Sequence, residues 1–201
     1  MVRIQDVAEA CGTSIATVSH VLNGTKAVRP ELAARVREAV RSLGYEANPL
    51  ARSLKSRRSH TIGLLVTNID RIFFSRVIRG VQEVLLQAGY QLTIGSTGDS
   101  LEREKTFFHT FQGRWTDGIL VDSTAGLGDE AWLAEMANAR VGQRKLPVVG
   151  LERRLDAYGM DSVGIDNRQA ARDATRFLLD RGCVRIAHLA GVATSPLAVE
   201  R

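Results

Sequence analysis

Two short segments of helical periodicity, joined by one glycine-containing turn, constrain the fold of this chain more than any other feature. The turn lies at Gly12 and Thr13, and Ser14 is suited to cap the second helix because its hydroxyl can accept a backbone N–H. On both sides of the turn the apolar residues recur at the spacing of one helix face: Ile4, Val7, Ala8 and Cys11, then Ile15, Val18, Val21 and Leu22. The pattern predicts a helix-turn-helix.

A third helix is predicted from Pro30 to Leu43. Proline is favoured at the first helical position, and Gly44 suits the position just past the end. Within the segment, the apolar residues form a single stripe, which we expect to pack on the first two helices: Leu32, Val36, Val40 and Leu43. Residues 1–46 are therefore predicted to form an all-α helix-turn-helix headpiece.

The excess positive charge of the chain lies entirely in its first part. Residues 1–60 hold 10 of the 27 Lys and Arg residues but only 5 of the 22 Asp and Glu residues, a difference that equals the whole net charge of +5. This asymmetry indicates a polyanion as the partner of the N-terminal region. The alternative is that the arginines of the third helix are simply solvated, and the helix-turn-helix pattern favours DNA over that alternative.

Several functional classes find no support in the sequence. No apolar run is long enough for a bilayer and the first residues lack the pattern of a secretory leader, so we expect no membrane partner and a cytoplasmic location. Cys11 and Cys183 are far apart, which fits a reducing compartment. The histidines show no metal-ligand spacing, so we expect no metal and no cofactor. The segment Gly95–Gly98 lacks the lysine of a phosphate loop, no nucleophile elbow is present, and we expect no enzyme.

The segment 47–60 is predicted to be a linker between two domains. It is basic, Asn48 and Pro49 can start a helix, and Leu50 and Leu54 are its only large apolar side chains. Such a short segment is not stably helical alone in water. It is either a plain basic linker or a helix that forms only on contact with DNA or a twin chain.

From residue 61 the pattern changes to alternating strands and helices. Strands are expected at 62–66, 90–94, 118–121, 147–151 and 184–189, with a short one at 162–165, and helices near 74–88, 100–112, 129–140 and 167–181. Strands separated by helices of this length predict right-handed crossovers and an α/β parallel sheet.

These segments together resemble the lactose-repressor/galactose-repressor family of transcription regulators, and within it the purine-repressor type. The resemblance lies in short motifs spread over the whole chain: Asp6-Val7-Ala8, Thr17 to Asn23, Leu43-Gly44-Tyr45, Asn48-Pro49, Ala51 to Lys55, Ile62-Gly63-Leu64, Asp117 to Leu120, Arg181-Gly182 and Ile186-Ala187. It implies a regulatory domain similar in fold to periplasmic sugar-binding proteins. Family members have two lobes and are longer, so we expect 61–160 to be the first lobe and 161–201 the truncated start of the second, with Phe177, Leu178 and Ile186 unburied.

The resemblance and the geometry of a helix-turn-helix assign roles on DNA. The N-terminal part of the second helix enters the major groove, which gives base contacts to Ile15, Ala16 and His20, although Ile15 can also pack in the core. Contacts to the DNA backbone are expected from the nearby polar side chains: Thr13, Ser14, Thr17, Ser19 and Asn23. In the linker, Leu54 is expected to wedge into a central minor-groove step beside Arg52 and Lys55, unless it packs on its own linker.

Ligands of open parallel sheets bind beyond the carboxyl ends of the strands. This rule points to Phe73 and Phe74, which either stack on a ring or sugar face or pack in a core or dimer interface. Asp122 and Glu152 can accept hydrogen bonds from hydroxyl groups, whereas Glu152 and Arg153 can equally form a surface ion pair.

The sequence therefore predicts a sequence-specific DNA-binding regulator, a repressor controlled by a small-molecule effector such as a sugar, a nucleobase or a related metabolite. One headpiece reads only half a site, so a homodimer on a pseudo-palindromic double-stranded operator is expected, in the bacterial cytoplasm at the nucleoid. Two alternatives stay open: a small-molecule binding protein without productive DNA regulation, and a truncated regulator that binds DNA without responding to effector.

Overall fold

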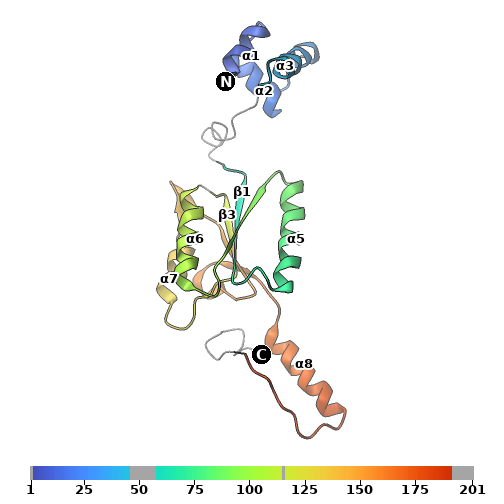
Figure 1. Cartoon of the computed structure of the whole chain (residues 1–201), viewed down its shortest axis with the longest axis vertical. Coiled ribbons are helices and arrows are strands. Elements are labelled where there is room, and N and C mark those ends of the chain that lie inside the picture. Colours follow the sequence, from blue (N-terminus) through green and yellow to red (C-terminus); the bar gives the residue numbers. More distant parts are fainter. Residues whose placement is uncertain (1, 46–57, 115, 192–201) are drawn as a thin grey trace. The chain divides into compact units, whose positions relative to one another are not determined.

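The computed structural model describes residues 2–45, 58–114 and 116–191, and the chain divides into two compact units, Met1–Arg57 and Arg58–Arg201 (Figure 1). The first unit contains the predicted headpiece, and the second contains the predicted sheet. Most of the predicted linker, including Arg52, Leu54 and Lys55, lies outside the described residues.

The first unit is a three-helix headpiece, as predicted. Helix α1 spans Ile4–Ala10, α2 spans Ile15–Asn23 and α3 spans Pro30–Leu43. One buried valine from each helix, Val7, Val18 and Val36, meets the others in the core. The predicted stripe of α3 is buried unevenly, because Leu32 and Val40 are half-buried and Leu43 lies at its exposed end.

The turn between α1 and α2 is held from α3. The Arg35 guanidinium donates to the carbonyl of Cys11 over 2.7 Å, and the buried Cys11 thiol lies 3.6 Å from the carbonyl of Arg35. The predicted cap is present, since the Ser14 hydroxyl accepts the backbone N–H of Thr17. These contacts fix the entry of α2 relative to the other two helices.

The second unit is built on a five-stranded parallel sheet with the strand order β2-β1-β3-β6-β7 (Figure 1). Its strands are β1 (Thr61–Val66), β2 (Gln91–Ser96), β3 (Gly118–Val121), β6 (Val148–Leu151) and β7 (Asp161–Val163). Helix α5 (Ile72–Gln87) covers one face, and α6 (Leu101–Gly113) and α7 (Glu130–Ala137) cover the other. The predicted parallel α/β architecture is confirmed.

One element of this unit was not predicted. The helix expected at 129–140 ends at Ala137, and the chain then forms a small antiparallel hairpin of β4 (Arg140–Val141) and β5 (Arg144–Lys145). Gly142, at a φ of +59°, makes the tight turn possible because glycine adopts this left-handed conformation without strain. A short 3-10 helix, Asp156–Tyr158, follows β6.

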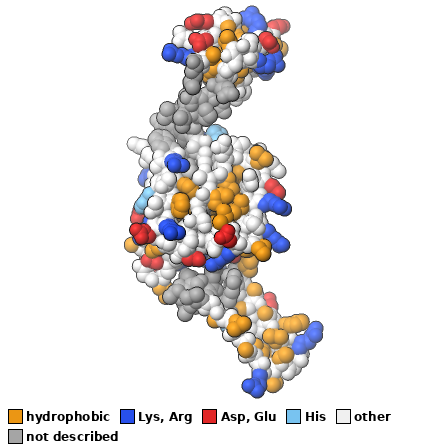
Figure 2. All heavy atoms as spheres, in the orientation of Figure 1, with side chains coloured by type: hydrophobic (Ala, Val, Ile, Leu, Met, Phe, Trp, Pro, Cys, Tyr) orange, Lys and Arg blue, Asp and Glu red, His pale blue; other side chains and the backbone are white. Residues whose placement is uncertain are grey.

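Helix α8 (Asn167–Asp180) follows β7 and presents apolar side chains to solvent (Figure 2). The expected exposure of Phe177, Leu178 and Ile186 is confirmed, at 56%, 39% and 41%. The strand predicted at 184–189 is wrong, since this segment has no regular secondary structure. A strand requires a paired neighbour for its backbone hydrogen bonds, and none of the described strands pairs with this segment.

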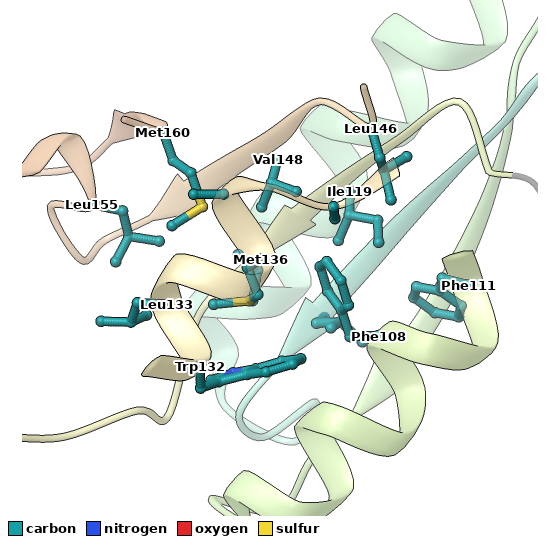
Figure 3. Packing of buried hydrophobic residues seen from close by; sticks show 14 of the residues in the cluster. Phe108, Phe111, Ile119, Trp132, Leu133, Met136, Leu146, Val148, Leu155 and Met160 are labelled. Carbon is teal, nitrogen blue, oxygen red and sulfur yellow. The ribbon is translucent and has the colours of Figure 1, made fainter. Parts of the chain in front are cut away.

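The main core lies between the sheet and the helices α6 and α7 (Figure 3). Phe108 of α6 meets Trp132 of α7 edge to face, with ring centroids 5.2 Å apart. Gly63 in β1 lets α6 approach closely, because a Cβ atom at this position would lie 2.3 Å from the ring of Phe111. This packing sets the position of the loops that follow β1 and β3.

Candidate nucleic-acid interface and ligand site

The exposed face of α2 combines apolar and polar side chains. Val18 is fully buried, and helical periodicity places Ala16, Ser19, His20 and Asn23 on the opposite side. Ala16 and Asn23 are exposed, and Ser19 and His20 are half-buried. The headpiece thus presents on one surface most of the side chains that the sequence predicts to meet DNA.

Ile15 lies at the edge of this surface and is 46% exposed. The sequence left open that Ile15 packs in the core. The structure does not show this packing, because the Ile15 side chain does not belong to the buried cluster of the headpiece. An exposed isoleucine at the first position of α2 can contact the methyl group of a thymine.

Local hydrogen bonds pre-arrange the polar side chains of α2. Ser14 and Thr17 share a hydroxyl–hydroxyl contact of 2.9 Å, and the Asn23 amide donates to the backbone carbonyl of Ser19 over 2.8 Å. The His20 Nδ1 atom lies 2.8 Å from the Thr25 hydroxyl. These contacts use only part of the hydrogen-bonding capacity of each group, and Thr13 is half-buried beside them. Sequence reasoning missed Thr25, which lies beyond the end of α2.

A buried aspartate ties the start of the second unit to its sheet. Asp117, which precedes β3, accepts the backbone N–H groups of Ser59 and His60 over 3.2 and 3.1 Å. Its carboxylate also pairs with the Arg144 guanidinium of the β4–β5 hairpin, over 3.1 Å. The last two residues of the predicted linker are thereby fixed at the amino end of β1 and β3.

At the opposite, carboxyl end of the sheet lies Asp122, directly after β3. It is 3% exposed, and one of its oxygens accepts the Thr67 hydroxyl over 2.7 Å. Burial raises the pKa of the Asp122 carboxyl from 3.8 to about 6; the hydrogen bonds from Thr67 oppose this shift, and the charges of Glu152 and Glu104 add to it. The structure thus brings Asp122 and Glu152 close enough to interact electrostatically.

Glu152 and Arg153 follow β6 at the same end of the sheet, and both are half-buried. Glu152 has a φ of +59°, a left-handed conformation that is uncommon for a residue with a side chain. In Arg153, one guanidinium nitrogen, Nη1, is buried and finds no hydrogen-bond acceptor among the described residues. The sequence left open that Glu152 and Arg153 form a surface ion pair with each other. Among the residues that the structure describes, no ion pair joins them.

The two adjacent phenylalanines of α5 lie in different surroundings. Phe74 is 2% exposed and packs with Leu64 and Val66 in the core between α5 and the sheet. Of the two roles that the sequence left open for Phe74, ligand stacking or core packing, the structure shows core packing, because the rotation of about 100° per residue in a helix turns it toward the sheet. Phe73 is 42% exposed and meets the Phe74 ring edge to face at 5.2 Å.

A buried glutamate that sequence reasoning missed shapes the loop after β3. Glu104 of α6 is fully buried and accepts four hydrogen bonds from residues beyond Asp122. The donors are the Ser123 hydroxyl at 2.7 Å, the Thr124 N–H at 2.6 Å, the Thr124 hydroxyl at 2.8 Å and the Trp132 Nε1–H at 2.9 Å. The signal in the sequence is a charged residue at helical spacing from Phe108 and Phe111, within an apolar stripe.

Two further classes of site are not found where the structure describes the chain. Within residues 2–45, 58–114 and 116–191, no three His, Cys, Asp or Glu side chains gather as metal ligands would. Over the same ranges, no helix has both the length and the hydropathy that crossing a bilayer requires.

Two family descriptions match this chain over nearly its whole length. "Bacterial regulatory proteins, lacI family" matches residues 3–48, and "Periplasmic binding proteins and sugar binding domain of LacI family" matches residues 59–201. The two matches follow the division of the structure into the headpiece unit and the sheet unit.

Individual relatives are regulators of transcription. Catabolite control protein A of Staphylococcus epidermidis is 32% identical over 192 residues, 94% of this chain and 56% of that protein. The HTH-type transcriptional repressor PurR of Vibrio cholerae is 35% identical over 201 residues, 100% of this chain and 58% of that protein. The crystal structure of the lac repressor dimer bound to operator and the anti-inducer ONPF superposes with a TM-score of 0.81, at 25% identity over 98% of this chain and 59% of that chain. The chain thus spans little more than half the length of these relatives.

Proposed function

Because this chain belongs to the LacI family of bacterial regulatory proteins, we propose that it is a sequence-specific DNA-binding transcription regulator, a repressor under the control of a small-molecule effector. The observation that carries this proposal is the exposed face of α2, which a three-helix core holds outward. We propose binding and regulation, not catalysis, as the activity of the chain.

Helix α2 is proposed to enter the major groove. Ile15 and Ala16 contact thymine methyl groups and His20 contacts a base edge, because these are the side chains that the first turns of α2 expose. The polar groups at the rim fix the register of the helix by contacts to phosphates: Thr13, Ser14, Thr17, Ser19 and Asn23. Arg52, Leu54 and Lys55 of the linker are proposed to occupy the minor groove between two half-sites.

Two copies of the chain are proposed to bind a pseudo-palindromic operator. In support, α5 carries a second row of residues beside its buried row: Phe73, Val77, Gly80 and Val84 follow one another at helical spacing, with Val77 half-buried. Phe73 and Val84 are 42% and 66% exposed, and Ile72 and Leu86 at 78% and 77% widen the apolar surface. Exposed apolar surface of this kind is typical of a protein interface.

The effector is proposed to bind at the carboxyl end of the sheet, near Phe73, Asp122, Glu152 and Arg153. Two carboxylates, and a buried guanidinium nitrogen that has no acceptor among the described residues, offer both acceptors and donors. That combination suits a neutral molecule with several hydroxyl or ring-nitrogen groups, such as a sugar or a nucleobase. The site of action is the bacterial cytoplasm, on the DNA of the nucleoid.

The proposal is tested by selecting duplexes from a random-sequence library with the full chain, followed by footprinting of the selected sites. We expect a pseudo-palindrome to be protected, and we expect affinity to fall at least about 100-fold between 50 and 200 mM salt, as counterions are released from several phosphates. Selection of no sequence, with the headpiece folded by circular dichroism, would leave a small-molecule binding protein as the better description.

The role of Leu54 is tested in the same assay. Leu54→Ala is expected to lower affinity for the selected site by about tenfold or more while leaving the headpiece folded, because the wedge that opens the minor groove is lost. The matched control is Leu127→Ala in the second unit, where the leucine is 99% exposed. Equal binding by the Leu54 variant and the parent would contradict the minor-groove role.

A further inference from the structure

The end of α2 places a second side chain against the histidine that is proposed to read a base. Helix α2 ends at Asn23, and Gly24 follows with φ +64° and ψ +19° in the left-handed region. A glycine there reverses the chain at the helix end without strain. The next residue, Thr25, is thereby brought back to the last turn of α2, where its hydroxyl lies 2.8 Å from His20 Nδ1.

The neighbouring polar side chains do not compete for the histidine ring. Asn23, one position before the glycine, uses its amide on the carbonyl and hydroxyl of Ser19, over 2.8 and 3.2 Å. Ser14 and Thr17 bond to each other at the start of the helix. Thr25 is therefore the side chain whose hydrogen bond the structure gives to His20.

The direction of the hydrogen bond at Nδ1 determines what the other ring nitrogen can do, because the Thr25 hydroxyl can either donate to Nδ1 or accept from Nδ1–H. When the Thr25 hydroxyl donates to Nδ1 of a neutral imidazole, the ring proton resides on Nε2, which then is a donor. Guanine presents only acceptors, N7 and O6, at its major-groove edge. A fixed ring with the proton on Nε2 matches guanine, whereas a ring free to exchange tautomers matches donors and acceptors alike.

We propose that Thr25 is a specificity-determining positioning residue, whose hydroxyl donates to Nδ1 of His20, holds the ring and leaves Nε2–H to read a guanine. This inference rests on the proposed function, because it assigns a role within the DNA-binding surface of α2. Thr25 acts through His20, and no contact of its own with a base is required. The base preference at one step of each half-site is therefore a property of the His20–Thr25 pair.

The test compares variants of the full chain in the random-sequence selection. Thr25→Val removes the hydroxyl at nearly constant shape and is expected to lower the preference for guanine at one step about threefold to tenfold, the range that one net hydrogen bond contributes. Thr25→Ser keeps a hydroxyl and should keep the preference. His20→Ala should abolish it, and Thr25→Val should have no further effect in that background. Ser42→Ala, which removes an exposed hydroxyl from α3, is the matched control.

The outcomes separate this inference from the function on which it rests. Selection of no sequence by the parent chain would contradict the proposed function itself. A guanine preference that His20→Ala abolishes and Thr25→Val leaves intact would overturn only the role of Thr25, and a preference unaffected by His20→Ala would overturn the role of the pair.

A measurement without DNA keeps the inference testable if a variant binds poorly. Nitrogen-15 chemical shifts of the His20 ring in the free chain should identify the proton on Nε2 in the parent and in Thr25→Ser. In Thr25→Val they should move toward a mixture of the two tautomers. Identical ring shifts in the parent and in Thr25→Val would overturn the proposal.

Discussion

Replacement of Glu104 by glutamine probes how the loop that carries Asp122 is held. The two carboxylate oxygens divide the four donors between them: Oε1 accepts Trp132 Nε1–H and the Ser123 hydroxyl, and Oε2 accepts the N–H and the hydroxyl of Thr124. Each oxygen therefore faces one N–H group that can only donate. A glutamine amide must place its NH2 group against one of these two N–H groups, whichever way it is turned.

The expected cost follows from this mismatch. One hydrogen bond to a carboxylate is lost, and one buried N–H is left without an acceptor, while the hydroxyls of Ser123 and Thr124 can rotate to accept. An unsatisfied buried donor costs about 1–3 kcal/mol, so Glu104→Gln is expected to destabilise the second unit by about 2–4 kcal/mol in total. Glu104→Ala loses all four bonds and leaves a cavity, so its cost should be larger, about 3–5 kcal/mol.

Urea unfolding followed by tryptophan fluorescence measures this cost in the correct unit, because both tryptophans of the sequence lie after residue 58. The matched control is Glu102→Gln, two residues earlier on α6 and exposed, with an expected change below about 0.5 kcal/mol. A Glu104→Gln protein that unfolds at the same urea concentration as the Glu102→Gln protein would refute the reasoning.

Two other carboxylates lead to predictions of different kinds. The pKa of Asp122 is higher in the folded chain, about 6, than its ordinary 3.8, so this group lowers stability as pH rises from 4 to 6. Asp122→Asn should remove this loss of unfolding free energy, which is up to about 3 kcal/mol. Urea midpoints of parent and variant at pH 4 and pH 8 measure the difference, and parallel pH profiles of the two proteins would contradict the prediction. Asp117→Asn should speed hydrogen exchange at the Ser59 and His60 amides and destabilise the unit by about 1–3 kcal/mol, since the carboxylate accepts both N–H groups and pairs with Arg144. Exchange at the parent's rate would exclude this anchoring role.

The sequence was sufficient for the parts of the fold that depend on local periodicity. Apolar spacing and capping chemistry within a few residues predict the three headpiece helices, including the third from Pro30 to Leu43, and the cap at Ser14. The five strands of the parallel sheet were also found within a residue or two of their ends. These features are local, so a single sequence contains the information that specifies them.

Features that depend on distant partners were not predictable in the same way. The segment 184–189 has the composition of a strand but lacks a paired neighbour among the described strands. Phe73 and Phe74 are equivalent in composition, and only the packing of α5 on the sheet decides which one is buried. Glu104 meets donors 19 to 28 residues away, which no local pattern reveals.

Glu104 and Asp122 are both buried at the carboxyl end of the sheet, but Glu104 accepts hydrogen bonds from more residues than Asp122 does. This difference indicates a structural role for Glu104 and a ligand-binding role for Asp122. Each carboxylate oxygen of Glu104 accepts two hydrogen bonds, and these bonds anchor the loop after β3. Asp122 has only Thr67, and one of its oxygens receives no hydrogen bond from the described residues. Oδ1 is not among the fully enclosed side-chain atoms that lack a partner. It is therefore open to a ligand hydroxyl or amine as a donor, while burial of the carboxyl as a whole costs stability. The same asymmetry explains why Asp122→Asn is expected to stabilise the chain while weakening effector binding, whereas Glu104→Gln should only destabilise it.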